Sequence, residues 1–254
     1  GGLAAWLLRR PLVIHEQNAV AGLTNRLLAR LAREVLAAFP GAFSAAIPAR
    51  AIGNPVRREI VSIEPPEERF KTHGRPLRLL VLGGSQGALI LNQTVPKALA
   101  LIAPEERPDV WHQAGEKIYE RALETYKQTG IDARLSKFID DMPAAYSWAD
   151  MVICRSGALT VSELAAAGLG AVLIPYPAAV DDHQTLNAEY LAEADAAVII
   201  AQTELSPERL AQEIGRCLSD RELAVSRACR ARELARPDAT RELVEACLLA
   251  GAVS

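Results

Sequence analysis

The first candidate for chemistry is a glycine-rich loop between an apolar run and a helical pattern. Residues 79–82 lead directly into Gly83-Gly84-Ser85-Gln86-Gly87-Ala88, and a helix is expected to follow. Backbone N–H groups and the helix dipole attract anions at such a junction, and the Ser85 hydroxyl adds a donor. Because the loop matches neither the Walker pattern nor GxGxxG, a phosphate loop and an ordinary tight turn both remain open.

A second junction of the same kind comes later in the chain. The apolar residues 151–154 end at Arg155-Ser156-Gly157, and a helix is expected from Ala158 onward. The carboxylate of Glu163 is suited to accept two hydrogen bonds from the hydroxyls of a nucleotide ribose. The spacing of Thr160 and Glu163 also fits a capping box, which would make the role of Glu163 structural.

A third polar loop, residues 181–187, follows the apolar run 171–174. Its Gln184 and Asn187 amides are suited to hold sugar hydroxyls, since ligands of open α/β sheets bind at the carboxyl ends of strands. The acidic pairs at 140–141 and 181–182 could suggest Mg²⁺, but one exposed pair is a poor site and helix capping is the favoured interpretation. The four cysteines and four histidines lack zinc or disulfide spacing, so we predict no metal site.

Further polar residues stand at the ends of other runs. Asn18 follows the expected strand 12–14 through His15 and Glu16, and a lone histidine there is more often structural. Arg57 could donate to a phosphate or cap a helix. The backbone at Ile139 could read the edge of a base, or it could be an ordinary hydrophobic strand end.

The elements that must position these residues alternate in a βαβ rhythm. Short Val/Ile/Leu runs separated by helical segments predict a parallel, doubly wound sheet covered on both faces. We expect its strands at residues 77–82, 109–113, 133–138, 151–154, 171–174 and 197–200. Residues 58–76 have the proline and glycine content of a linker.

The two parts differ in charge. Residues 1–57 contain seven arginines against Glu16 and Glu34, a formal charge of +5, so the remaining 197 residues carry −8. Arginines interleaved with leucine and Trp6 are typical of a surface that binds anionic membranes, although a solvated helix face fits equally well. Nucleic acid is disfavoured as a partner, because the chain is mildly acidic and lacks interleaved stacking aromatics.

Seven motifs in order resemble the MurG family of glycosyltransferases: VIHEQNAVAGLTNRLLAR, GNPVR, VLGGSQGA, WHQAGEK, FIDDM, CRSGALTVSELAAAG and DDHQTLNA. The resemblance implies an α/β GT-B fold with two Rossmann-like doubly wound domains. Residues 1–57 would be the remaining part of an N-terminal, membrane-facing acceptor domain. Residues 58–254 would be the donor domain, with the final helices packing back toward the N-terminal domain.

The resemblance also assigns the residues that bind UDP-N-acetylglucosamine. Glu163 would take the ribose, Ile139 the uracil, the helix start at residues 157–158 the diphosphate, and Gln184 with Asn187 the sugar. The full set of implied contacts is Asn18, Arg57, Ser85, Ile139, Ala158, Leu159, Thr160, Val161, Ser162, Glu163, Gln184 and Asn187. Gly170 and Ala178 depart from the family pattern, which has proline and histidine there.

The implied reaction is inverting transfer of N-acetylglucosamine to the 4-hydroxyl of undecaprenyl-diphospho-N-acetylmuramyl-pentapeptide (lipid I). It needs no cofactor, and it serves peptidoglycan synthesis and hence cell shape and division. The expected location is peripheral, on the cytoplasmic face of the bacterial membrane.

Family members carry roughly a hundred residues before the position of Gly1, and the acceptor-side base is expected there. We therefore expect the chain alone to bind UDP without turnover, and the catalytic residue stays unknown. Alternative functions are a glycolipid glycosyltransferase such as a diacylglycerol glucosyltransferase, a UDP-N-acetylglucosamine 2-epimerase, and a non-catalytic UDP-sugar-binding fragment.

Overall fold

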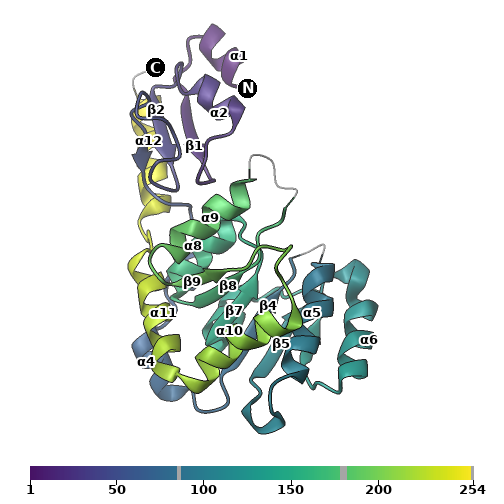
Figure 1. The fold of residues 1–254 in the computed structure, drawn as a ribbon. Helices are drawn as coiled ribbons and strands as arrows, with labels where there is room; N and C mark the ends of the chain where they lie inside the picture. The colour runs from purple at the N-terminus through teal and green to yellow at the C-terminus, as the bar shows by residue number, and fades with distance from the viewer. Residues whose placement is uncertain (85–86, 178–181, 253–254) are drawn as a thin grey trace.

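The protein contains two parallel β-sheets, each with its own helices (Figure 1). The computed structural model describes residues 1–84, 87–177 and 182–252. We call the part built on the first sheet the small unit and the part built on the second sheet the large unit. Both ends of the chain lie beside the small unit in the view of Figure 1.

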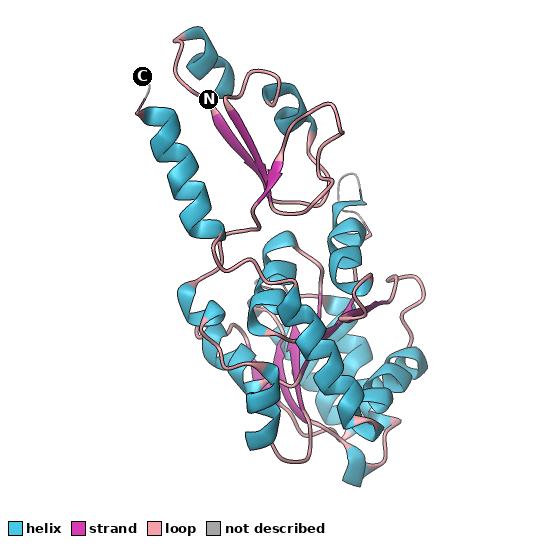
Figure 2. Ribbon diagram, turned by 90° about the vertical axis from the view of Figure 1, so that its left-hand side faces the viewer, coloured by secondary structure: helices cyan, strands magenta, loops and turns pink. Residues whose placement is uncertain are grey.

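The small unit is a three-stranded sheet in the order β1-β2-β3. Its strands are β1 (Val13–Glu16), β2 (Glu34–Ala37) and β3 (Arg50–Ala51), and its helices are α1 (Gly2–Leu7) and α2 (Leu23–Leu28). The last helix of the chain, α12 (Ala239–Gly251), returns to this sheet and lies alongside it (Figure 2). Ala246 of α12 is buried against Leu36 and Ile52, so the beginning and the end of the chain share one apolar cluster.

The large unit is a six-stranded parallel sheet in the order β6-β5-β4-β7-β8-β9. Its strands are β4 (Arg78–Leu82), β5 (Asp109–Gln113), β6 (Arg134–Ser136), β7 (Met151–Cys154), β8 (Gly170–Leu173) and β9 (Ala197–Ile199). The chain winds outward from β4 to β6 and then returns to β7, so the winding direction reverses between β4 and β7. In open α/β sheets, this reversal is where ligands bind.

Helices cover both faces of the large sheet, because successive strand residues point to opposite faces. Leu80 and Leu82 face one apolar cluster, and Leu79 and Val81 face the other. The first cluster includes residues of α7 (Met142–Trp148), α8 (Ala158–Ala167) and α9 (His183–Ala192). The second includes residues of α5 (Leu89–Ala100), α6 (Tyr119–Thr129) and α10 (Pro207–Ser219), with α11 (Arg221–Glu233) contributing to both. Two short 3-10 helices, η1 (Pro104–Glu106) and η2 (Glu116–Ile118), flank β5.

Local chemistry sets where these helices begin and end. The Ser206 side chain accepts from the backbone N of Arg209 at the start of α10, and Asp141 accepts from Ala144 N at the start of α7. Helix α8 ends at Gly168, whose φ of 63° lies in the left-handed region that favours glycine. A Cβ at Gly168 would also meet Pro66 Cγ at 2.7 Å, so both backbone angle and space require glycine.

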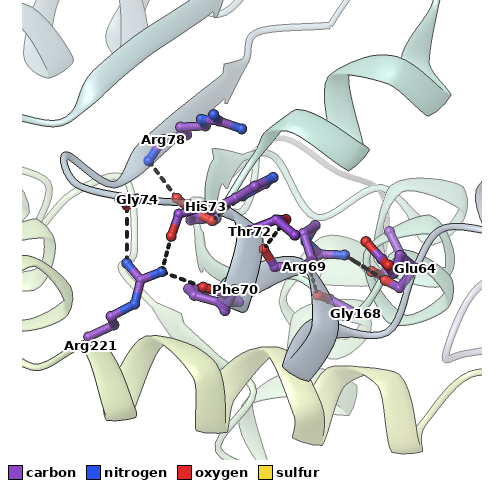
Figure 3. Close-up of polar contacts among 11 residues, drawn as sticks. Glu64, Arg69, Phe70, Thr72, His73, Gly74, Arg78, Gly168 and Arg221 are labelled. Carbon is purple, nitrogen blue, oxygen red and sulfur yellow. Dashed lines mark hydrogen bonds and ion pairs between the residues drawn. The ribbon is translucent and has the colours of Figure 1, made fainter.

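The segment predicted as a linker is helical and firmly attached. It forms α3 (Arg58–Val61) and α4 (Pro66–Thr72), and Figure 3 shows how polar contacts attach it to the large unit. Buried Arg69 donates to the carbonyls of Glu64, Ala167 and Gly168. Arg69 thereby satisfies backbone carbonyls both within its own segment and at the end of α8. A flexible linker would not make such fixed contacts.

A second anchor of this segment is the pair His73–Asp150 near the amino end of β4. His73 Nδ1 donates to Asp150 Oδ1 at 2.8 Å, and Asp150 Oδ2 accepts from the backbone N of Arg78 at 2.9 Å. Arg221 of α11 donates to the carbonyls of Phe70, His73 and Gly74 (Figure 3). The segment 58–76 is thus part of the large unit's framework.

The structure confirms the predicted doubly wound sheet, and the predicted strands agree with the observed ones to within a few residues. One prediction about the small unit is wrong: His15 and Glu16 belong to strand β1 and not to the loop after it. They continue the parallel pairing with Leu36 and Ala37, and His15 Nε2 donates to the carbonyl of Gly53 at 2.9 Å. The predicted boundary between residues 57 and 58 stays a prediction.

Candidate functional site

A cavity of about 230 Å³ opens at the carboxyl ends of β4 and β7. These strands are direct neighbours, with Leu82 paired to Cys154, so the cavity lies where the winding of the sheet reverses. We call it the donor cavity, after the sugar-nucleotide donor that the sequence resemblance leads us to expect there. Its lining consists of Leu82, Gly83, Gly84, Gln113, Phe138, Ile139, Met142, Tyr146, Cys154, Arg155, Thr160 and Glu163.

The carboxylate of Glu163 is the acidic group of this cavity. Its Oε2 accepts a hydrogen bond of 3.0 Å from the Tyr146 hydroxyl, and its Oε1 lies 3.4 Å from the Arg57 guanidinium. The capping-box alternative is wrong, because α8 begins at Ala158 after Gly157 and no side chain caps it. Glu163 therefore lies inside the helix, and its carboxylate points to the cavity.

The other members of the run 158–163 divide by the face of α8 on which they lie. Thr160 lines the donor cavity. Val161 is fully buried in the apolar core, and Leu159 is 48% exposed. Ala158 is buried beside the helix start, and its carbonyl accepts from Ser162 Oγ at 3.0 Å. Only Thr160 and Glu163 of this run offer polar side chains to the cavity.

Ile139 also lines the cavity, in a wall where its backbone is held by a side chain that the sequence analysis missed. The Ile139 N–H donates to Gln113 Oε1 at 3.0 Å, and Gln113 is the last residue of β5. Both residues are buried and line the cavity. Gln113 could have been predicted as a site residue, because it is a polar residue at the end of a buried apolar strand.

The glycine loop after β4 makes close contact with this wall. A Cβ at Gly83 would lie 2.9 Å from the carbonyl oxygen of Gln113 and 2.9 Å from Ala88 N, so only glycine fits without moving backbone. Ser85, the predicted hydroxyl donor of this loop, lies outside the described residues, as does Ala178. The helix start of α8 contributes its dipole at the neighbouring junction.

Asn18 and Asn187 meet each other at the boundary of the two units. Asn187 Nδ2 donates to Asn18 Oδ1 and to the carbonyl of Ser156, each at 3.3 Å, while its Oδ1 accepts from Ala19 N at 2.8 Å. The side chain of Asn187 is thus buried and bridges the units. Its predicted sugar contact stays a prediction, and its amide is already engaged by protein groups.

Glu16 sets the position of Asn18. One carboxylate oxygen accepts from the backbone N and Nδ2 of Asn18, and the other accepts from Gly22 N and Asn25 Nδ2. Burial alone would raise the pKa of Glu16, but these hydrogen bonds outweigh burial and lower it. The carboxylate thereby fixes the turn that carries Asn18 toward the large unit.

Asn54 makes a second bridge between the units, beside Arg57. Its buried Nδ2 donates to the Gln17 carbonyl at 3.0 Å and to Ser162 Oγ at 3.1 Å. Arg57 precedes α3 and has a side chain that is 48% exposed. The motif GNPVR of residues 53–57 did not reveal this role of Asn54, since its partners lie up to 108 residues away.

Gln184 lies apart from the donor cavity, in the first turn of α9. Its Oε1 accepts from the backbone N of Tyr176 at 2.9 Å, and Tyr176 lies against the Arg155 guanidinium, 5.3 Å from the ring centroid. Arg155 itself donates to the carbonyls of Ile174 and Pro175 and to Gln202. The structure thus brings together Ile139, Thr160, Glu163 and Arg57 of the predicted contacts, and it places Gln184 on a neighbouring loop.

Two further buried groups define the electrostatics of the cavity. Burial, reinforced by the charge of Glu163, raises the pKa of Tyr146 well above its ordinary value, and burial raises the pKa of Cys154 to about 12. Both stay protonated near neutral pH.

Within residues 1–84, 87–177 and 182–252, no cluster of three metal-binding side chains occurs. No helix in the same residues is long and apolar enough to cross a membrane.

Comparison with known proteins identifies both units. Residues 78–243 match the glycosyltransferase family 28 C-terminal domain, and residues 1–37 match the glycosyltransferase family 28 N-terminal domain. The predicted α/β GT-B fold is thereby confirmed. Among solved structures, HepE from Anabaena in complex with UDP has the same fold, with 17% identity and a TM-score of 0.63 over 97% of this chain and 74% of that one.

More similar relatives share one named activity. Proteins from Marinobacter nauticus and Nitrosococcus oceani are 53% and 55% identical over 98% of this chain and over 68% and 69% of their own lengths. Both are named UDP-N-acetylglucosamine–N-acetylmuramyl-(pentapeptide) pyrophosphoryl-undecaprenol N-acetylglucosamine transferase. The crystal structure of Acinetobacter baumannii MurG, at 42% identity, superposes with a TM-score of 0.86 over 96% of this chain and 68% of that one. The chain therefore belongs to the MurG family of UDP-N-acetylglucosamine transferases within glycosyltransferase family 28.

Proposed function

We propose that the chain belongs to an enzyme that transfers N-acetylglucosamine from UDP-N-acetylglucosamine to the 4-hydroxyl of lipid I, in the step of peptidoglycan synthesis that makes lipid II. The observation that carries the proposal is the donor cavity, with an acidic group and a helix start at the reversal point of the sheet. Membership of the family supports the sugar and the acceptor.

We assign each part of UDP-N-acetylglucosamine to the groups of the cavity whose chemistry suits it. Glu163 accepts hydrogen bonds from the ribose hydroxyls, and the backbone of Ile139 with Gln113 faces the uracil. The diphosphate lies between the start of α8 and the glycine loop after β4, where N–H groups and two helix dipoles favour negative charge. Arg57 adds a half-exposed cation at the boundary of the two units.

The chemistry of transfer then depends on stabilising the leaving group. As the acceptor hydroxyl attacks the anomeric carbon, the bond to UDP breaks and negative charge develops on the β-phosphate. Fixed backbone donors and the dipole of α8 stabilise that charge without reorganising. No described residue is assigned as the base that takes the proton of the acceptor hydroxyl.

The acceptor's lipid lies in a membrane, and the small unit has a protein surface suited to bind that membrane. Leu3, Leu7 and Leu8 of the α1 region are 64 to 72% exposed, and Leu23 and Leu27 of α2 are 65% and 55% exposed. Exposed arginines surround them at positions 9, 10, 26, 30 and 33. Apolar side chains among arginines support peripheral binding to the anionic cytoplasmic face of the membrane.

The test compares donors and acceptors directly. Calorimetry is expected to give tighter binding of UDP-N-acetylglucosamine than of the corresponding CDP- or GDP-linked sugars. With the chain joined to the segment that family members carry before the position of Gly1, radiolabelled N-acetylglucosamine is expected to appear on lipid I and not on diacylglycerol, and N-acetylmannosamine is not expected among the products. The chain alone is expected to bind the donor without turnover. Transfer to diacylglycerol, or epimerisation of the donor sugar, would favour one of the other GT-B activities and overturn the proposal.

A further inference from the structure

The donor cavity contains a buried tyrosine that touches its acidic group. Tyr146 of α7 is 1% exposed, and its ring packs in the apolar cluster beneath the cavity. Its hydroxyl donates to Glu163 Oε2 at 3.0 Å. Since α7 and α8 are separate helices that flank β7 in the chain, this bond joins two elements at the edge of the cavity.

The direction of this hydrogen bond is fixed. An ionised carboxylate can only accept, so the phenol must donate. Burial, with the adjacent charge of Glu163, raises the pKa of Tyr146 well above its ordinary value. The hydroxyl therefore keeps its proton, and the donor is present throughout the neutral pH range.

The bond constrains a side chain that is otherwise free to turn. A glutamate has three rotatable side-chain bonds, and only its two carboxylate oxygens can be held from outside. Arg57 holds Oε1 loosely, because the distance is 3.4 Å and the arginine side chain is 48% exposed, whereas Tyr146 holds Oε2 from a buried position. Tyr146 uses one of about four acceptor positions on the carboxylate, so positions for two ribose hydroxyls remain.

We infer that Tyr146 is a positioning residue for donor binding, whose hydroxyl holds the Glu163 carboxylate in the orientation that accepts the ribose 2′- and 3′-hydroxyls. The inference rests on the proposed function, in which Glu163 binds the ribose. Tyr146 itself makes no bond to the donor in this arrangement, and its effect passes through Glu163.

The test uses Tyr146→Phe and two nucleotides that differ by one hydroxyl. Phenylalanine keeps the ring in the core and removes only the donor. Calorimetry is expected to show UDP binding weakened about three- to tenfold in Tyr146→Phe, because the Glu163 carboxylate loses the hydrogen bond that orients it toward the ribose. Binding of 2′-deoxy-UDP is expected to weaken less, so the preference for UDP over 2′-deoxy-UDP falls.

A matched control is Tyr126→Phe, on the opposite face of the sheet. Tyr126 is likewise buried and hydrogen-bonded, with its hydroxyl 2.9 Å from His112 Nδ1. Its replacement removes an equivalent hydroxyl from the core without touching the cavity. We expect Tyr126→Phe to lower the melting temperature while leaving the preference for UDP over 2′-deoxy-UDP unchanged.

Glu163→Gln separates the failure of the inference from the failure of the proposed function. If Glu163→Gln reduces the preference for UDP but Tyr146→Phe leaves it at the wild-type value, Tyr146 is only a packing residue and the inference is wrong. If Glu163→Gln also keeps the wild-type preference, the ribose assignment itself fails. In the double variant, the tyrosine substitution is expected to have no further effect on this preference.

Discussion

Asn187 Oδ1 accepts a hydrogen bond of 2.8 Å from the backbone N–H of Ala19, which lies 168 residues earlier in the chain. The same amide donates to Asn18 Oδ1 from its Nδ2 atom. A residue expected to touch the sugar is thus a buried bridge between the two units. The relative position of the units therefore depends on buried polar groups of one unit whose hydrogen-bond partners lie in the other.

Asn187→Ala is expected to destabilise this bridge by about 1–3 kcal/mol, because buried partners lose their hydrogen bonds. Hydrogen exchange of the Ala19 amide should accelerate with it. Asn92→Ala is the matched control, since Asn92 is equally buried but donates to Ala114 within the large unit. Unchanged exchange at Ala19 in Asn187→Ala would show that the bridge does not hold the units.

Glu163→Gln should weaken UDP binding by about 1.5–3 kcal/mol, or roughly ten- to a hundredfold, as charge-assisted hydrogen bonds to the ribose become neutral. Stability should change little, because the amide oxygen can still accept from Tyr146, and a pair with half-exposed Arg57 contributes less than about 1 kcal/mol. Calorimetry and thermal unfolding measure the two effects. Wild-type affinity combined with a lower melting temperature would make Glu163 a structural residue.

The contribution of Glu16 to stability should depend on pH. Its folded-state pKa lies below the ordinary value of 4.5, so the carboxylate stabilises the fold above that pH, and this stabilisation is lost as the pH falls through the folded pKa. Glu16→Gln, with an amide facing the donors of Gly22 and Asn25, should cost about 1.5–3 kcal/mol at neutral pH. Chemical denaturation should show the difference from wild type shrinking in acid. A difference independent of pH would contradict this explanation.

Reversing the charge of Arg9, Arg10, Arg30 and Arg33 should weaken binding to phosphatidylglycerol vesicles at least tenfold, since each arginine near such a surface contributes about 1 kcal/mol. The effect should diminish with added salt. Reversal of the exposed Lys97, Lys117, Arg121 and Lys127 on the large unit is the charge-matched control, and it should leave vesicle binding much closer to wild type. Equal losses in both variants would indicate that only net charge matters.

Asp150→Ala should destabilise the large unit by about 2–4 kcal/mol. The carboxylate is fully buried and accepts from both His73 Nδ1 and the Arg78 backbone, so its removal leaves two partly buried donors without a partner. Urea denaturation measures the loss. His73→Ala, which removes only the 11% exposed partner, should cost less, and an equal or larger cost would mean that the carboxylate is not the central group.

The sequence predicted the large sheet well because periodicity and strand length are local properties. Uninterrupted apolar runs such as residues 151–154 can only be buried between two layers of helices. The glycine loop and the start of α8 were likewise visible as strand-to-helix junctions. The residues 58–76 were misjudged as a linker, because proline and glycine content does not reveal that Arg69 will satisfy three carbonyls of its surroundings.

The site residues were predictable only where a local sequence pattern, such as a strand-to-helix junction, indicates their role. Glu163 was found through its junction, whereas Tyr146 reads as a core aromatic on a helix until its distance from Glu163 is known. Asn187 was noted as a polar loop residue, and Asn54 appeared only within the motif GNPVR. Their partners lie 168 and 108 residues away. Hydrogen bonds between residues so far apart do not affect the local spacing of residue types in the sequence, so only the folded structure shows them.

The return of α12 to the small sheet has a consequence for synthesis in the cell. The ribosome makes β1 and β2 near the start of this chain, yet Leu36 and Ile52 are covered by Ala246, and Arg50 pairs with Glu242 at 2.5 Å. All six strands of the large unit have emerged before α12 is translated. Strands β1 and β2 are thus synthesised before the large unit, but α12 can cover their apolar face only after all the strands of the large unit have been made.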